Sequence, residues 1–109
     1  MSLEIIPERE PRGLRVVGEV DLATAPGLSQ AISAALMEDP RGLVLDVSGV
    51  SFMDSTGIHA LIEAARLMAE EDPLVLLSPS AQVRRVLDLL GLDGGLPGVR
   101  IVDRSHAAD

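Results

Sequence analysis

LVLDVSGVSFMDSTG, the stretch from Leu43 to Gly57, joins a buried apolar run to the start of a helix. Leu43–Val47 is short and nearly continuous in apolar residues, which is typical of a strand buried on both faces. Ser48–Asp54 is predicted to be a connection, because it contains Gly49. Gly57–Ala69 carries apolar residues at helical spacing, so it is predicted to be an amphipathic helix. A strand followed by such a helix indicates an α/β fold.

On the N-terminal side, two apolar segments, Leu3–Pro7 and Leu14–Val20, are predicted to be strands. The polar segment between them, residues 8–13, is short enough for an antiparallel hairpin. A loop over Asp21–Gly27 leads into another helix. That helix is expected to end at Asp39-Pro40, because the residue before a proline disfavours helical backbone.

On the C-terminal side, Pro73–Leu77 is predicted to be a further buried strand. Ser80 is expected to cap a third helix, and Gly91 is a natural stop for it. Val99–Val102 is predicted to be the last strand, followed by a frayed tail over residues 103–109. The order predicts a mixed sheet of about five strands, largely parallel and opened by the hairpin, flanked by three to four helices.

The composition limits the possible partners. The 109 residues fit one domain over residues 1–109. The net charge of −8 argues against binding to nucleic acid or an anionic membrane and favours a basic protein partner. Phe52 is the one aromatic residue, so there are no platforms on which bases could stack.

The sequence lacks the residues and segments that several kinds of site, and secretion or membrane insertion, would require. Without cysteine there are no disulfides, thiolate zinc sites or thiol catalysis. His59 and His106 lie far apart and indicate no metal cluster. The N-terminus does not resemble a signal peptide, and no apolar run approaches the roughly 18 residues that a membrane helix needs. We therefore expect a cytoplasmic protein.

Chemistry is concentrated in Asp54-Ser55-Thr56-Gly57, where two hydroxyls lie at a predicted helix N-terminus. Backbone N–H groups there lack intrahelical partners and the helix dipole adds positive charge, so a phosphate on Ser55 would be well held. Thr56 is the alternative acceptor. Serine, threonine and aspartate before a helix are also ordinary N-caps, so position alone leaves a capping role open.

Enzymatic interpretations of this segment are weak. The glycine-rich spacing of a phosphate-binding loop is missing. A nucleophile elbow needs glycines two residues before and after the serine; Gly57 fits, but Met53 occupies the other position. Neither histidine is an obvious base, so we expect no enzymatic activity.

Two motifs carry a resemblance to a known family. Gly18-Glu19-Val20-Asp21-Leu22 and, about 30 residues later, LVLDVSGVSFM followed by Asp54-Ser55-Thr56-Gly57 resemble STAS domains, most closely anti-sigma factor antagonists. The resemblance implies a STAS-type α/β fold over the whole chain. It implies that an anti-sigma factor with serine kinase activity phosphorylates Ser55. The unmodified protein would bind that partner and release a sigma factor, and phosphorylation would break the complex.

The same resemblance implies the cofactors and the site. ATP and magnesium would belong to the partner kinase, with no cofactor of this chain's own, and a serine phosphatase is expected as a further partner. Asp21 and Asp46 are expected near Ser55, and Asp54 and Gly57 complete its environment. The expected partner-binding residues are Thr24, Met53, Ser55, Thr56, His59 and Glu63.

Structural roles remain open beside these. Asp21 is placed to accept turn hydrogen bonds, and Asp46, inside an apolar strand, must find donors near Ser48 or Ser55. His59 and Glu63 fit a solvated helix face.

Three other functions are compatible with the sequence. A STAS subunit of a phospholipid-transport ABC complex, or a stress-signalling scaffold component, would bind its partner constitutively. The second such function is that of a nucleotide-binding module, and the third is that of a hydrolase.

Overall fold

Strands and helices alternate along the chain in the computed structural model, which describes residues 2–9, 12–68, 72–91 and 98–103. The elements are β1 (Leu3–Arg9), β2 (Arg12–Val20), α1 (Ala25–Glu38), β3 (Leu43–Met53), α2 (Ser55–Arg66), β4 (Leu74–Leu77), α3 (Ala81–Leu89) and β5 (Val99–Val102). The predicted tail lies almost entirely outside the described residues, and so does His106.

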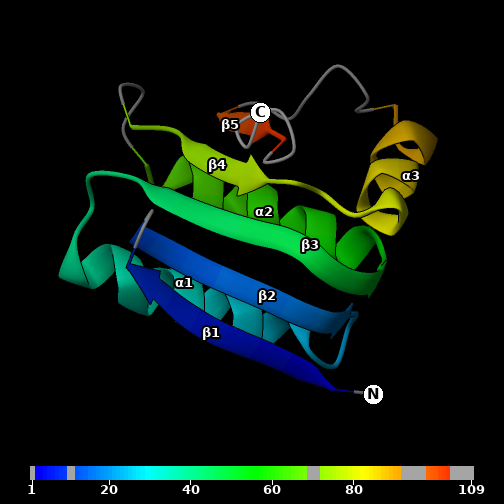
Figure 1. The fold of residues 1–109 in the computed structure, drawn as a ribbon, viewed down its shortest axis with the longest axis horizontal. Coiled ribbons are helices and arrows are strands. Elements are labelled where there is room, and N and C mark those ends of the chain that lie inside the picture. Colours follow the sequence, from blue (N-terminus) through cyan, green and yellow to red (C-terminus); the bar gives the residue numbers. More distant parts are fainter. Residues whose placement is uncertain (1, 10–11, 69–71, 92–97, 104–109) are drawn as a thin grey trace.

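The five strands form one sheet in the order β1-β2-β3-β4-β5 (Figure 1). β1 pairs antiparallel with β2, and every later pair is parallel. Parallel neighbours need a crossover, and α1, α2 and α3 supply the three crossovers. The predicted mixed sheet, opened by a hairpin, is confirmed.

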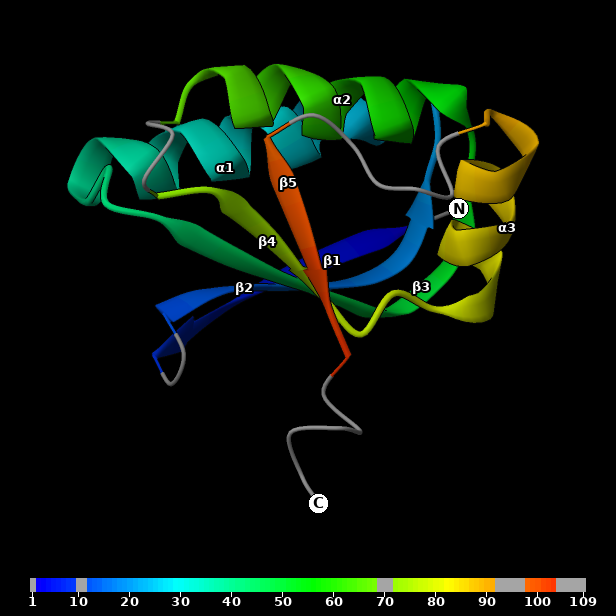
Figure 2. The ribbon, with the colours of Figure 1, turned by 90° about the horizontal axis from the view of Figure 1, so that it is seen from above.

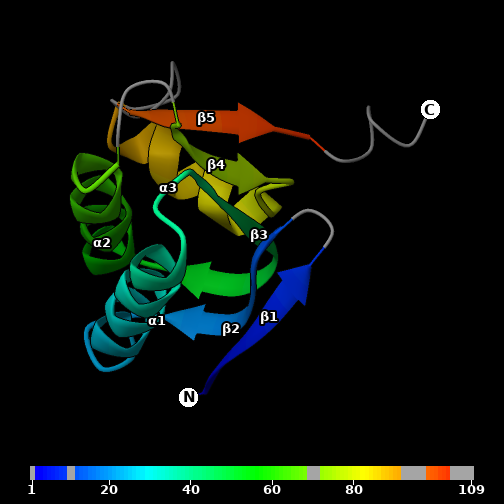
Figure 3. The same ribbon diagram turned by 90° about the vertical axis from the view of Figure 1, so that its left-hand side faces the viewer.

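One face of the sheet carries α1 and α2, which lie side by side (Figures 2 and 3). Their apolar stripes point into the core: Leu28 and Ile32 of α1 and Ile58 and Leu61 of α2 are buried against strand residues. Burial of these stripes against the sheet is the main source of stability for helices of this length.

The predicted connection at Ser48–Asp54 is wrong, because β3 continues to Met53. After Asp46, β3 runs beside β2, where Gly49 pairs with Val17 and Met53 pairs with Val20. Two register shifts interrupt this pairing and break the alternation that would have indicated a strand.

α3 lies beside this second half of β3 (Figure 2). The Ser80 hydroxyl donates to the Val50 carbonyl over 2.7 Å and accepts from the Val83 N–H, so the predicted cap also ties α3 to the strand.

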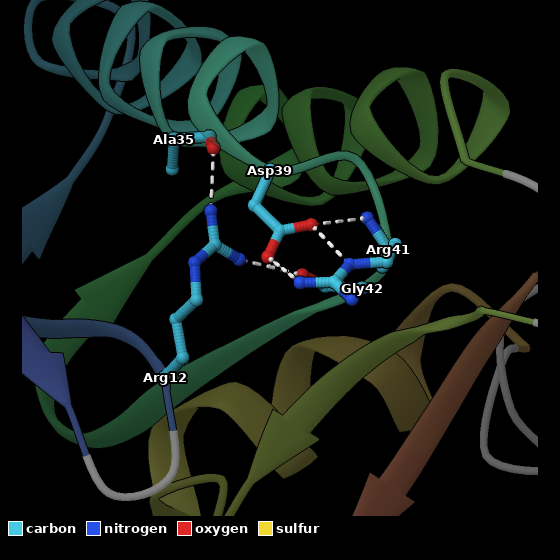
Figure 4. Close-up of polar contacts among 5 residues, drawn as sticks. All are labelled: Arg12, Ala35, Asp39, Arg41 and Gly42. Carbon is cyan, nitrogen blue, oxygen red and sulfur yellow. Dashed lines mark hydrogen bonds and ion pairs between the residues drawn. The ribbon is translucent and has the colours of Figure 1, made fainter.

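At the opposite end of the sheet, three charged residues secure the connection from α1 to β3 (Figure 4). Arg12 donates to the carbonyls of Ala35 at 2.6 Å and Gly42 at 2.8 Å. Asp39 accepts from the side chain and the backbone N–H of Arg41 over 2.9 to 3.0 Å. These hydrogen bonds hold the pKa of the Asp39 carboxyl well below its ordinary value and raise the pKa of Arg41.

Candidate functional site

β2 and β3 end together, and this brings the two sequence motifs to one edge of the sheet. Val20 pairs with Met53, and the Asp54 N–H donates to the Val20 carbonyl over 3.2 Å. The turn after β2 therefore lies beside the start of α2. Asp21 and Ser55 share this edge, as the resemblance implied.

Asp54 is the N-cap of α2. Its Oδ1 accepts the Thr56 N–H over 2.9 Å and also the Thr56 hydroxyl. The helix begins at Ser55, two residues before the predicted start, because this cap already fixes the first turn. The capping role that position alone left open belongs to Asp54.

Ser55 is the first residue of α2 and is exposed. Among the described residues, its hydroxyl makes no hydrogen bond. A phosphate at this position would lie at the positive end of the helix dipole, next to the Asp54 carboxylate. Ser55 is therefore accessible to a modifying enzyme without any rearrangement of its own side chain.

The turn after β2 is held by Asp21. Its Oδ1 accepts from the backbone N–H groups of Ala23 at 2.9 Å and Thr24 at 3.1 Å. The Thr24 hydroxyl donates to the Glu19 carbonyl over 2.8 Å. The structural role considered for Asp21 is confirmed, and Thr24 helps to fix the same turn.

Gly57 sets how closely α2 approaches the strand ends. A Cβ on this residue would lie 2.7 Å from Met53 Cγ and 2.8 Å from Val20 Cγ1. Both neighbours are buried core side chains. The glycine is thus needed for packing, and through that packing it places the first turn of α2 at the sheet edge.

Met53 was expected to contact the partner, and this expectation is wrong. Its side chain is 1% exposed and belongs to the core. Its neighbour Phe52, 37% exposed, is the apolar residue that faces outward here. Adjacent strand residues point to opposite faces, so only one of the two could lie at the surface.

Asp46 is not brought to the site. It pairs with Arg15 and Leu77 in the middle of the sheet, and seven residues of β3, on the order of 23 Å of strand path, separate it from Met53. The carboxylate is 2% exposed and accepts the Ser48 N–H at 3.0 Å and hydroxyl at 2.7 Å. Of the two locations considered for its donors, Ser48 is confirmed.

A groove runs between α1 and α2 from the Ser55 end of the molecule, and we call it the α1–α2 groove. Its first hollow, about 230 Å³, is lined by Leu22, Ala25, Pro26, Ser29, Thr56, His59, Ala60 and Glu63. A second hollow, about 140 Å³, shares Ser29, Ala60 and Glu63 and continues to Ile32, Ser33, Ala64 and Leu67. Alanine and serine side chains of both helices line the groove, and they are too short to fill the space between the helices.

Charged and apolar residues border the groove. Glu63 lies 3.7 Å from His59 Nε2 and 3.2 Å from Arg66, and all three are more than half exposed. Leu22 at one end is 76% exposed, and Leu67 at the other is 65% exposed. Neither leucine was predicted as a binding residue by name, although Leu22 lies in the first of the two family motifs. Its exposure could have been expected, since an apolar residue inside a polar turn has no element to bury it.

Other possible sites lie elsewhere or are absent from the described part of the chain. A hollow of about 350 Å³ borders Arg12, Ala35 and Leu43, at the end of the sheet opposite Ser55. No cluster of potential metal ligands occurs among the described residues. Within the same residues, no helix has the length and apolar character needed to cross a membrane.

Comparison with known proteins agrees with the fold and the motifs. A model of the STAS domain family matches residues 5–108. Because the match spans nearly the whole chain, the protein belongs to the STAS domain family, and the expected STAS-type fold is confirmed.

Named relatives share one description. The chain is 32% identical over 80 residues to the anti-sigma-F factor antagonist RsfB of Mycobacterium tuberculosis, a match that covers 73% of this chain and 66%, just under two thirds, of that protein. The crystal structure of an anti-sigma factor antagonist from Mycobacterium paratuberculosis is also 32% identical, with a TM-score of 0.78 over 91% of this chain and 86% of that one. The antagonist SpoIIAA in its unphosphorylated form shares the fold at 23% identity, with a TM-score of 0.69 over 99% and 94% of the two chains.

Proposed function

We propose that this protein is an anti-sigma factor antagonist controlled by phosphorylation of Ser55. The observation that carries the proposal is the exposed Ser55 hydroxyl, which lies in the first turn of α2 next to the α1–α2 groove. Unmodified, the protein binds an anti-sigma factor with serine kinase activity and thereby releases a sigma factor. The names of the relatives support the antagonist role.

Charge explains how the modification would act. A phosphate adds about −1.5 to −2 charges at pH 7. On Ser55 it would lie beside Asp54 and on the same sheet edge as Asp21, in a chain whose net charge is already −8. An interface closed around the serine would have to desolvate this added charge. A loss of ~3 kcal/mol would weaken binding roughly a hundredfold.

The partner's contact surface is proposed to include the Asp21–Thr24 turn, Thr56, His59 and Glu63. ATP and magnesium belong to the kinase, and a serine phosphatase reverses the modification. The protein itself holds no cofactor and catalyses no reaction. It acts in the cytoplasm, where it meets its partner.

The test is intact mass and peptide mapping after incubation with ATP, magnesium and the candidate anti-sigma kinase, beside a Ser55→Ala variant. One phosphate on Ser55 is expected, and none on the variant. Calorimetry should then show that the phosphoprotein binds the kinase roughly a hundredfold more weakly than Ser55→Ala.

Two results would count against the proposal. Equal binding by the modified and unmodified protein would remove the role of phosphorylation. No phosphate transfer by a kinase shown to be active on another substrate would favour a constitutive STAS subunit instead.

A further inference from the structure

Two adjacent hydroxyls, on Ser55 and Thr56, lie in the first turn of α2, but their surroundings differ. Ser55 is exposed, and its hydroxyl makes no hydrogen bond among the described residues. Thr56 is partly buried, and its hydroxyl donates to Oδ1 of Asp54. The same oxygen accepts the Thr56 N–H over 2.9 Å, so one carboxylate holds both the backbone and the side chain of Thr56.

We propose that Asp54 directs phosphorylation to Ser55 by keeping the Thr56 hydroxyl out of reaction. The inference rests on the proposed function and adds a positioning residue to it. Asp54 selects the acceptor through Thr56, and it does not itself need to take part in the transfer.

The chemistry of the transfer explains why the hydrogen bond matters. A bond forms between the acceptor hydroxyl oxygen and the γ-phosphorus of the kinase-bound ATP. The bond from that phosphorus to the bridging oxygen breaks, ADP leaves, and the hydroxyl proton passes to a base of the kinase. An acceptor must therefore be reachable and must turn its proton toward the kinase. Ser55 meets both conditions, whereas Thr56 gives its proton to a carboxylate of its own chain, a strong charge-assisted hydrogen bond.

The test uses Asp54→Gly, because glycine is a well-tolerated N-cap that has no carboxylate. Four proteins are compared with the kinase, ATP and magnesium: wild type, Ser55→Ala, Asp54→Gly and the double variant Ser55→Ala/Asp54→Gly. Phosphate is located by peptide mapping, and circular dichroism checks that each variant is folded. Adding Thr56→Val to the double variant is the control that identifies the acceptor.

The expected result is phosphate on Ser55 alone in the wild type and essentially none on Ser55→Ala. The double variant should be phosphorylated on Thr56 at least tenfold faster than Ser55→Ala, and Thr56→Val should abolish that labelling. Asp54→Gly alone should carry phosphate on both residues. A role of Asp54 in stability alone would not move the phosphate from one residue to the other.

Three results would overturn the inference. The first is labelling of Thr56 in Ser55→Ala as fast as labelling of Ser55 in the wild type. The second is a double variant that stays unlabelled while Asp54→Gly is labelled on Ser55. The third is loss of Ser55 labelling in Asp54→Gly, which would mean that the kinase itself recognises Asp54.

A second measurement needs no kinase. In NMR spectra at low temperature, the Thr56 hydroxyl proton should exchange slowly with water in the wild type and fast in Asp54→Gly. Equal exchange in the two proteins would overturn the inference even if the wild type took up no phosphate. Absence of phosphate with slow Thr56 exchange would instead count against the proposed function alone.

Discussion

The position of α2 depends on Gly57, because this residue has no side chain. A Cβ there would overlap Met53 and Val20, which are both buried. We therefore expect Gly57→Ala to destabilise the fold by about 1–3 kcal/mol, a usual range for overpacking a core. Urea unfolding followed by circular dichroism measures this, because the chain has no tryptophan or tyrosine to report by fluorescence.

Gly27→Ala is the matched control for this prediction. Gly27 lies in α1, and a Cβ on it would meet nothing within 4 Å. Alanine should stabilise the helix there by up to about 0.5–1 kcal/mol. If Gly57→Ala also stabilises the protein, helix propensity and not packing determines the effect at Gly57.

Single residues show what could be predicted about the site. Ser55 and Asp54 were found because a polar cap before an amphipathic helix is a local pattern. The sequence left open whether Met53 is buried or exposed, because its orientation depends on two register shifts between β3 and β2. Asp46 was predicted to need donors, which is correct, but its distance from Ser55 follows from the length of β3.

At the scale of elements, Asp39 and Arg41 predict how the α1–β3 connection responds to acid. The pKa of Asp39 is lowered by its hydrogen bonds with Arg41, so the folded state favours the charged carboxylate. That contribution is fully present above the ordinary value of 3.8 and is lost as the pH falls below it.

Wild type should therefore be more stable than Asp39→Asn at pH 6, and the difference should shrink below about pH 4. Thermal unfolding of both proteins between pH 2 and pH 7 measures this. A difference that stays constant across the range would show that the Asp39 charge does not contribute.

The elements themselves were largely predictable, because each depends on a short-range pattern. The hairpin, the buried strand β4 and the cap of α3 were all predicted close to their observed bounds. The second half of β3 was not, since its alternation is broken by irregularities that only the partner strand reveals. Pairing with β2 outweighed the local signal of Gly49, which had favoured a connection.

At the scale of the whole molecule, exposed leucines at different places on the surface can test how far the proposed interface extends. Leu67 lies at the far end of the α1–α2 groove, about 18 Å along α2 from Ser55. If the partner occupies the full groove, Leu67→Ala should weaken binding about fivefold, or ~1 kcal/mol.

Leu89→Ala is the control, because Leu89 is similarly exposed at 78% but belongs to α3, and it does not line the groove. Its binding should stay within about twofold of wild type. Calorimetry with the same partner compares the two. If Leu67→Ala also stays within about twofold of wild type, the interface is limited to the Ser55 end of the groove.

The groove could not be predicted from the sequence. It exists because α1 and α2, which are separated in the chain by β3, pack side by side with small residues between them. No local sequence pattern predicts the distance between the two helices. The net charge, by contrast, is known from composition alone and already favoured a basic protein partner.

The Arg12–Asp39–Arg41 contacts and the Ser55 site lie at opposite ends of the sheet. If the partner binds the groove as proposed, substitutions on the groove rim would therefore change partner preference without loosening the contacts that hold α1 to β3. After gene duplication, two copies of such a domain could acquire separate partners while keeping one scaffold. A cell could in this way insulate several parallel signalling pathways from one another with the same small fold.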